Sequence, residues 1–213
     1  MLVDKSVRQL LDAFAAPTPT PGGGSAAALA GAMAAALLEM VASMPKTKNG
    51  TPEDRAALDA ALPELKALRA SLTDLVDRDS ASYDAVVAAY KLPKATDDEK
   101  AARKAAVREA MRGATDVPLE TARASLAVAR FTQVIAEHGN PNAKSDASVA
   151  VGLAMQAAGG ARANVEINVD SVGDADYAVA VRGELERLMI ETAMTLRTTM
   201  EGLGWKGHQP PRS

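Results

Sequence analysis

The sequence has 213 residues, of which 47% are hydrophobic and 24% are charged, and its net charge at pH 7 is −3. A chain of this length suits one domain, or at most two, with a sizeable buried core. The small negative charge offers no electrostatic basis for binding nucleic acid or an anionic membrane, and the absence of cysteine excludes disulfides and thiolate chemistry.

Only 3% of the residues are aromatic, so the core must consist mainly of Ala, Leu, Val and Met. Small side chains bring helix axes close together but bury less apolar area per residue. We therefore expect two or more copies of the chain to associate, as a homodimer or higher oligomer.

The chain begins with an expected amphipathic helix at residues 4–16, where Val7, Leu10, Leu11 and Phe14 recur at helical spacing. A Pro/Gly-rich loop at 17–24 ends it, and Ser25 is the expected N-cap of an Ala-rich helix at 25–44. That helix is long enough to cross a bilayer. Its Ala and Gly content favours a buried helix of a soluble protein. Without a signal-peptide core near the N-terminus, we expect a cytoplasmic protein.

The loop residues Gly22, Gly23 and Gly24 lead into the helix that Ser25 begins. Free backbone N–H groups and the positive end of the helix dipole make such a junction suitable for an anion. The alternative is that the glycines only allow close packing and Ser25 only caps the helix. No Lys follows the glycines and no strand precedes them, so neither a P-loop nor a Rossmann fingerprint is present.

Helical periodicity, caps and helix breakers define the later elements. Pro63 should kink the helix expected at 52–91. The helix expected at 97–138 should be interrupted between Gly113 and Pro118, where Thr115 would cap it again. Three glycines, Gly152, Gly159 and Gly160, suggest close packing of the helix expected at 145–168. The expected helices span 52–91, 97–138, 145–168 and 174–203.

No segment has strong strand alternation, so we expect an all-α fold. It would be a single-domain bundle of about six to eight helices over residues 1–203, with the Ala-rich helix at its centre. Residues 204–213 would form a mobile tail.

One carboxylate interrupts the apolar stripe of the helix at 52–91. Asp79 falls between Leu75 and Tyr83, where an apolar side chain is expected. Burial raises the pKa of a carboxyl group and makes it a candidate acid or base. The alternative is a structural ion pair with an Arg or Lys of another helix. Asp77 is two residues away and points to another side of the helix.

Two further segments carry side-chain amides. Asn140 and Asn142 lie on a Pro-containing loop, ahead of Ser145 and Asp146, which could simply be helix caps. Asn164 and Asn168 are four residues apart and share a helix face. No metal site is expected, because the sequence has no Cys and no pair of His at ligand spacing.

Four segments together resemble the cyclodeaminase/cyclohydrolase family of folate enzymes. They are PTPGGGS at 19–25, the helix with Asp77 and Asp79 that ends in LPKAT at 92–96, GNPN at 139–142 followed by Ser145 and Asp146, and NVEIN at 164–168. Their order and spacing cover nearly the whole chain.

The resemblance implies an all-helical dimer or higher oligomer with folate bound near the subunit interface. It implies one of two activities. One is the interconversion of 5,10-methenyltetrahydrofolate and 10-formyltetrahydrofolate by a cyclohydrolase; the other is the closure of 5-formiminotetrahydrofolate with release of ammonia by a cyclodeaminase. The segment LPKATDDEKAA at 92–102, in a chain without the transferase domain of animal members, resembles bacterial cyclohydrolases most.

The resemblance also suggests roles for the matched residues, with no cofactor beyond the tetrahydrofolate substrate. The resemblance covers both Asp79 and Asp77 as the acid or base, and the apolar stripe favours Asp79. The four asparagines, with Ser145 and Asp146 beside them, would bind the pterin, and the junction of Gly22, Gly23, Gly24 and Ser25 would hold an anionic part of folate. Lys94, Lys46 and Lys48 could meet its glutamate tail. A non-catalytic folate-binding or scaffold protein, or a purely structural oligomer, are the alternatives, and Asp79 argues against both.

Overall fold

A computed structural model describes residues 1–44 and 50–204. In these residues the secondary structure is helical, without strands, which confirms the all-α prediction. Lys46, Lys48 and residues 205–213 of the expected tail lie outside the described part. The elements are α1 (Val7–Ala15), α2 (Gly23–Ser43), α3 (Pro52–Tyr90), α4 (Asp97–His138), the short 3-10 helices η1 (Pro141–Ala143) and η2 (Val169–Val172), α5 (Lys144–Asn168) and α6 (Ala175–Gly202).

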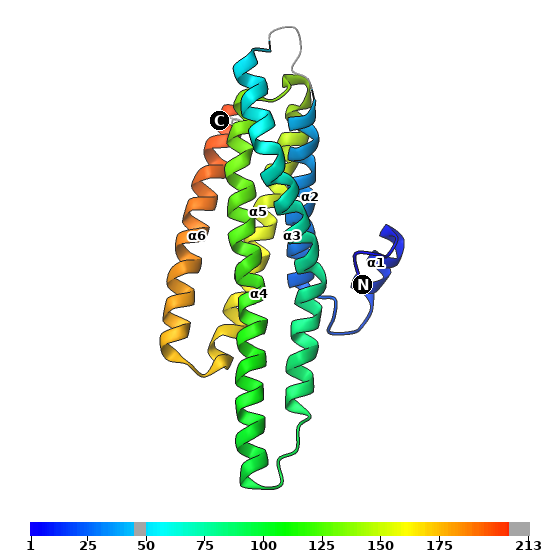
Figure 1. The fold of residues 1–213 in the computed structure, drawn as a ribbon, viewed down its shortest axis with the longest axis vertical. Helices are drawn as coiled ribbons and strands as arrows, with labels where there is room; N and C mark the ends of the chain where they lie inside the picture. Colours follow the sequence, from blue (N-terminus) through cyan, green and yellow to red (C-terminus); the bar gives the residue numbers. More distant parts are fainter. Residues whose placement is uncertain (45–49, 205–213) are drawn as a thin grey trace, which may run out of the picture.

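The helices form an elongated bundle in which α2 contacts α3, α4 and α5, and α6 packs against α4 and α5 (Figure 1). The long helices α3 and α4 extend beyond the others and form a two-helix projection at one end. Helix α1 stands away from the bundle and has no buried residue. The expected helix at 4–16 is therefore present, but its apolar side chains do not join the core.

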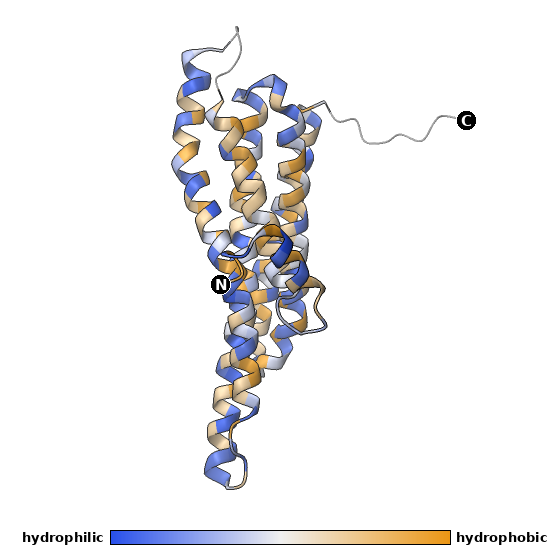
Figure 2. Cartoon of the chain, turned by 90° about the vertical axis from the view of Figure 1, so that its right-hand side faces the viewer, coloured by the Kyte–Doolittle hydropathy of each residue, from blue (hydrophilic) through white to orange (hydrophobic). Residues whose placement is uncertain are grey.

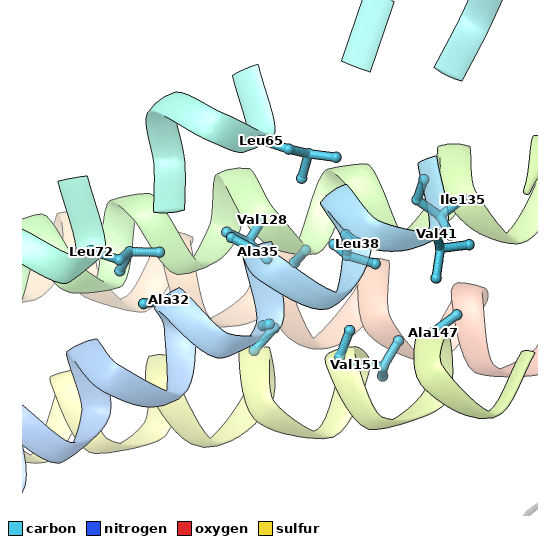
Figure 3. Packing of buried hydrophobic residues seen from close by; sticks show 14 of the residues in the cluster. Ala32, Ala35, Leu38, Val41, Leu65, Leu72, Val128, Ile135, Ala147 and Val151 are labelled. Carbon is cyan, nitrogen blue, oxygen red and sulfur yellow. The ribbon is translucent and has the colours of Figure 1, made fainter. Parts of the chain in front are cut away.

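The main apolar core lies around α2. Leu38 and Val41 of α2 pack with Leu72 of α3, Val128 of α4 and Val151 of α5, all of them at most 2% exposed (Figure 3). Helix α2 has the length and apolar composition of a membrane span, but more than half of it is buried by its neighbours. The expectation of a central Ala-rich helix is confirmed.

Small residues allow α5 to approach α2 closely. A Cβ on Gly160 would lie only 2.8 Å from the Cβ of Ala27, so the close-packing explanation is correct for this glycine. It is wrong for Gly152 and Gly159, because a Cβ on either would meet no atom within 4 Å.

Side chains cap the start of the three helices α3, α4 and α6. Thr51 and Thr96 each form a capping box, with Asp54 and Glu99 three residues later, and Asp174 caps α6. Pro63 lies within α3 and does not end it. The start of α2 differs from the prediction: Gly22 is the N-cap and Ser25 lies within the first turn, fully buried.

Helix α4 runs without interruption through Gly113 and Pro118, contrary to the expected break. Proline has no N–H to donate to the carbonyl four residues earlier, here that of Ala114. The side-chain nitrogen of Asn168 donates to that carbonyl oxygen instead, at 2.8 Å. Thr115 is buried and donates to the Met111 carbonyl, so it does not cap a second helix. A contact from α5 therefore compensates for the proline.

The apolar stripe of α3 is buried only where other helices cover it. Leu65, Leu72 and Leu75 are at most 1% exposed, whereas Tyr83 and Tyr90 are 41% and 51% exposed. Both tyrosines belong to the last turns of α3, and that end of the helix projects beyond the neighbouring helices (Figure 1). Hydrophilic residues dominate the tip of this projection (Figure 2).

Candidate functional site

The Pro/Gly-rich loop, α3, α4 and α5 surround a cavity of about 320 Å³ at the N-terminal end of α2. The loop and the first turn of α2 form one wall, and side chains of the three long helices form the others. The lining residues are Pro19, Thr20, Gly22, Gly23, Gly24, Asp79, Ser82, Tyr83, Val86, Met111, Ala114, Asn164, Ile167 and Asn168.

Asp79 of α3 is held against the first turn of α2. The hydroxyl oxygen of Ser25 lies 2.9 Å from Asp79 Oδ2, 2.9 Å from the Val76 carbonyl oxygen and 3.1 Å from the Ser80 hydroxyl. Ser25 thus fixes the position of Asp79 across two helices. Its buried hydroxyl has this tertiary role in place of the expected capping role.

Gly24 allows this close approach. A Cβ on Gly24 would lie 2.1 Å from Asp79 Oδ1 and 2.6 Å from its carboxyl carbon. Any side chain at position 24 would therefore occupy the space that the carboxylate needs. Of the three glycines of the loop, Gly24 is the one that this packing requires.

Opposing effects act on the pKa of Asp79. Burial raises it and is the largest effect, while hydrogen bonding to the hydroxyl and the backbone of Ser25 lowers it; the net result is a raised pKa. The positive end of the α2 dipole also favours the charged form. Asp79 itself occupies the helix start that could have held a ligand anion, and a second anion there would be repelled.

Asp79 is the only carboxylate among the described residues that line the cavity, and this lining contains no Lys, Arg or His. Asp79 makes no ion pair with any described residue. The structural ion pair considered from the sequence is therefore absent from this part of the chain. No group of three or more metal-ligating side chains occurs among the described residues either.

Asn164 and Asn168 line the same cavity from α5, as their spacing on one helix face predicted. Each commits its side-chain nitrogen to a backbone carbonyl, Asn164 to Gly160 and Asn168 to Ala114, both at 2.8 Å. Each side-chain oxygen, and the second hydrogen on each side-chain nitrogen, remains for a ligand. The pair can thus accept hydrogen bonds from a polar heterocycle.

Asp77 does not reach this cavity. Its Oδ1 accepts a hydrogen bond from the backbone N–H of Leu2 at 2.5 Å, which ties the N-terminal segment to the bundle. Of the two aspartates, only Asp79 is placed for chemistry in the cavity.

The asparagines of the GNPN loop lie at the opposite end of α2. Asn140 Oδ1 accepts from the backbone N–H of Asn142, and Asn140 lines a small cavity beside Val41. Because α2 has 21 residues, about 30 Å separates its two ends. Ser145 and Asp146 follow at the start of α5. Within one chain these four residues do not join Asp79, and Lys94 lies in a separate groove.

Tyr83 is a lining residue that sequence reasoning did not propose. It lies four residues after Asp79 and therefore on the same face of α3. The four-residue spacing from Asp79 could have identified it, but Tyr83 also fits the apolar stripe of α3 and was therefore expected in the core. Met111, Ala114 and Ile167 gave no comparable signal, because their place in the cavity depends on how three helices pack.

Comparison with known proteins identifies the family. The family model for formiminotransferase-cyclodeaminase matches residues 6–187. The chain is 42% identical over 191 residues to a methenyltetrahydrofolate cyclohydrolase of Methylorubrum extorquens, an alignment that covers 90% of this chain and 92% of that protein. It is 33% identical to the formimidoyltransferase-cyclodeaminase of Rattus norvegicus, with 89% of this chain aligned to 35% of that longer protein.

A similar fold occurs in the crystal structure of formiminotetrahydrofolate cyclodeaminase from Thermotoga maritima. The TM-score is 0.85 at 27% identity, and the match covers 96% of this chain and 98% of that one. The sequence and the fold agree, and the chain belongs to the formiminotransferase-cyclodeaminase family.

Proposed function

We propose that this chain is a methenyltetrahydrofolate cyclohydrolase, which adds water to 5,10-methenyltetrahydrofolate to give 10-formyltetrahydrofolate. The observation that carries the proposal is the lone carboxylate of Asp79 in a cavity without cationic side chains. The 42% identity with the Methylorubrum extorquens cyclohydrolase supports the choice of substrate.

The methenyl bridge is a delocalised cation, so a single buried carboxylate stabilises it electrostatically. Water attacks the bridging carbon and passes one proton to Asp79 as the new carbon–oxygen bond forms. The bond from this carbon to N5 then breaks, N5 receives the proton from Asp79, and the hydroxyl oxygen becomes the formyl carbonyl by losing its proton to solvent. One proton is released overall.

The raised pKa of Asp79 suits this role, because it makes the carboxylate a stronger base than an exposed one. Ser25 keeps the carboxylate in place during both proton transfers. The side-chain oxygens of Asn164 and Asn168 accept hydrogen bonds from N–H groups of the pterin ring. Tyr83 and Met111 contribute flat or apolar surface against it.

Cyclodeaminase activity is the second candidate, and the fold match to the Thermotoga maritima enzyme favours it. In that reaction Asp79 would manage the proton on the attacking nitrogen and on the departing amine. A non-catalytic scaffold is disfavoured, because burying Asp79 without an ion pair has an energetic cost that an apolar side chain at this position would avoid.

We also propose that copies of the chain associate, as the low aromatic content suggests. Met33 and Met40 of α2 and Val149 and Met155 of α5 are each at least 37% exposed, and α2 and α5 are neighbours. A partner copy over this apolar surface would supply the missing burial. Light scattering on the eluting protein measures the mass in solution, and a monomer across micromolar concentrations would contradict this expectation.

An absorbance assay tests the function. Purified protein receives 5,10-methenyltetrahydrofolate or, separately, 5-formiminotetrahydrofolate. We expect faster loss of the first substrate than in buffer. Consumption of only the second would establish the cyclodeaminase, and consumption of neither would refute both activities.

Two matched variants assign the chemistry. Asp79→Asn should abolish turnover but retain folate binding, whereas Asp77→Asn removes the same charge two residues away and should remain active. Loss of activity in Asp77→Asn with retention in Asp79→Asn would refute the assignment.

A further inference from the structure

The buried hydroxyl of Ser25 has three polar neighbours but only one hydrogen to share among them. Its oxygen lies 2.9 Å from Asp79 Oδ2, 2.9 Å from the Val76 carbonyl oxygen and 3.1 Å from the Ser80 hydroxyl oxygen. A serine hydroxyl donates one hydrogen bond and can accept two. The directions of these hydrogen bonds therefore decide how strongly Ser25 supports the charge of Asp79.

The direction of the bond between the two serines follows from the other two neighbours. A backbone carbonyl and an ionised carboxylate can only accept, so Val76 and Asp79 both require the hydrogen of Ser25. If Ser25 donated to Ser80 instead, two acceptor oxygens would face the Ser25 oxygen at 2.9 Å with no hydrogen between them. Ser80 is therefore the donor, and Ser25 the acceptor, in the contact between the two hydroxyls.

Charge decides which acceptor receives the hydrogen of Ser25. A hydrogen bond to an ionised carboxylate is about twice as strong as one between neutral groups. The Val76 carbonyl lies within α3 and also accepts a helical hydrogen bond from the backbone four residues later, so it keeps a partner when Ser25 turns away. While Asp79 is ionised, the hydrogen bonds therefore run in one direction, from Ser80 to Ser25 and from Ser25 to Asp79.

Hydrogen bonds in such a chain polarise and strengthen one another. Donation from Ser80 makes the Ser25 hydroxyl a better donor to Asp79, and this favours the charged carboxylate. Ser80 thus works with Ser25 against the effect of burial, which raises the pKa of Asp79. Once Asp79 takes up a proton, its charge no longer attracts the hydrogen of Ser25, which can turn to the Val76 carbonyl without movement of any side chain.

Other charged groups have little access to Asp79. Among the described residues that line its cavity, Tyr83 is the only other titratable side chain, and those that come from α2, α4 and α5 are uncharged. Next to Asp79 on α3, Asp77 binds the N-terminal segment, and Arg78 pairs with Glu120 of α4 at 2.7 Å. The pKa of Asp79 therefore depends on burial and on the hydrogen bonds of Ser25, and Ser80 acts on the latter.

We propose that Ser80 is a positioning residue for the proton transfers of Asp79, and that it acts through Ser25. Its hydroxyl donates to Ser25 and strengthens the hydrogen bond from Ser25 to the ionised carboxylate. The proposal rests on the proposed function, in which Asp79 first accepts and then returns a proton. Ser80 is not among the residues that line the cavity, so it does not touch the reacting atoms.

Replacing Ser80 by alanine tests this role in two ways. Carbon-13 NMR of protein with labelled aspartate follows the carboxyl group of Asp79, identified as the titrating signal that is missing in Asp79→Asn. Its midpoint should move to higher pH in Ser80→Ala, because the charged form loses support. The acid limb of kcat/KM for 5,10-methenyltetrahydrofolate should move in the same direction, with kcat/KM roughly twofold lower on this limb and unchanged at neutral pH.

The double variant Ser25→Ala/Ser80→Ala shows whether Ser80 acts through Ser25. Ser25→Ala alone should move the midpoint further than Ser80→Ala does, and the second substitution should then add no further movement. Ser148→Ala is the matched control, because the Ser148 hydroxyl donates to the Lys144 carbonyl within α5, at 2.9 Å. It should change neither measurement. Ser80 is half-buried within α3, where alanine is the better helix former, so Ser80→Ala should fold, which thermal unfolding checks.

The outcomes separate this role from the proposed function. If the wild type consumes 5,10-methenyltetrahydrofolate but Ser80→Ala leaves the NMR midpoint or the acid limb unmoved, the role of Ser80 fails and the function stands. A shift that keeps its full size in the Ser25→Ala background would also overturn it, because Ser80 would then act by another route. If the wild type consumes neither 5,10-methenyltetrahydrofolate nor 5-formiminotetrahydrofolate, the function and the role of Ser80 are both overturned.

Discussion

Replacing Gly24 by alanine tests whether the position of Asp79 decides activity. The new Cβ would lie 2.1 Å from Asp79 Oδ1, while ordinary van der Waals contact begins at 3.4 Å. The carboxylate must therefore withdraw by at least about 1.3 Å, because the backbone of α2 is packed between α3 and α5. This movement separates Asp79 Oδ2 from the Ser25 hydroxyl, now 2.9 Å away.

A misplacement of about 1 Å can cost 10²-fold in rate. We therefore expect Gly24→Ala to lower kcat by roughly two orders of magnitude, or about 2.7 kcal/mol in activation free energy. Stability should change far less than activity, because alanine suits the first turn of a helix better than glycine and offsets part of the lost hydrogen bonding.

Steady-state kinetics with 5,10-methenyltetrahydrofolate and thermal unfolding measure the two effects separately. Gly183→Ala is the control, since Gly183 lies within α6 and a Cβ there would meet no atom within 4 Å. It should leave kcat unchanged and raise stability by about 1 kcal/mol. Near-normal kcat in a folded Gly24→Ala protein would refute the argument that Asp79 needs this position.

Three further substitutions probe the same site. Ser25→Ala removes a hydrogen bond that lowers the pKa of Asp79, so the acid limb of the pH profile of kcat/KM should move to higher pH; an unmoved limb would contradict this. Asp79→Asn should raise the Tm at pH 7 but not below pH 3.8. The pKa of Asp79 is raised in the folded protein, so its ionisation destabilises the fold as pH rises from the unfolded pKa of 3.8 through the folded pKa. Equal shifts in Tm at both pH values would contradict this. Asn168→Ala leaves the Ala114 carbonyl at Pro118 without its partner and should cost about 1–3 kcal/mol in unfolding free energy, measured by urea denaturation; an unchanged midpoint would contradict this.

Local sequence signals predicted the helices well but not the role of Ser25. Thr51, Thr96 and Asp174 each cap a helix in the way that the adjoining sequence favours, because a cap depends on residues within one turn. Ser25 has the same capping preference, but its hydroxyl serves the contact with α3. The position of the neighbouring helix decides whether such a serine caps its own helix or bonds to another one. The local sequence does not specify that position.

The separation of the two asparagine pairs could have been predicted. The helix expected at 145–168 begins three residues after Asn142, and the 20 residues from its start to Asn164 span about 30 Å. The two pairs therefore had to lie at opposite ends of α5, as they do. The family resemblance predicted that all four asparagines bind the pterin. The length of the helix between the two pairs shows that they cannot share one site within a single chain.

The unbroken helix α4 needed tertiary information. Gly113 and Pro118 are both helix breakers by local preference. The carbonyl of Ala114 that Pro118 leaves free receives its hydrogen bond from Asn168, which is 54 residues away in the sequence. Asn168 therefore does two things at once: it completes α4 and forms part of the cavity wall. A substitution there will disturb both, so it cannot by itself assign Asn168 a role in binding.

The charge of Asp79 also bears on turnover in the proposed reaction. The substrate carries a positive charge at the bridging carbon, and the product is neutral there. A carboxylate buried without a cationic partner attracts the substrate more strongly than the product, and the bound cation lowers the pKa of Asp79. When the bridge opens, this attraction disappears and the pKa of Asp79 returns to its raised value. The uncompensated charge of Asp79 therefore favours binding of the cationic substrate and weakens binding of the neutral product. Asp79 also becomes a stronger base once the positive charge of the bridge is lost.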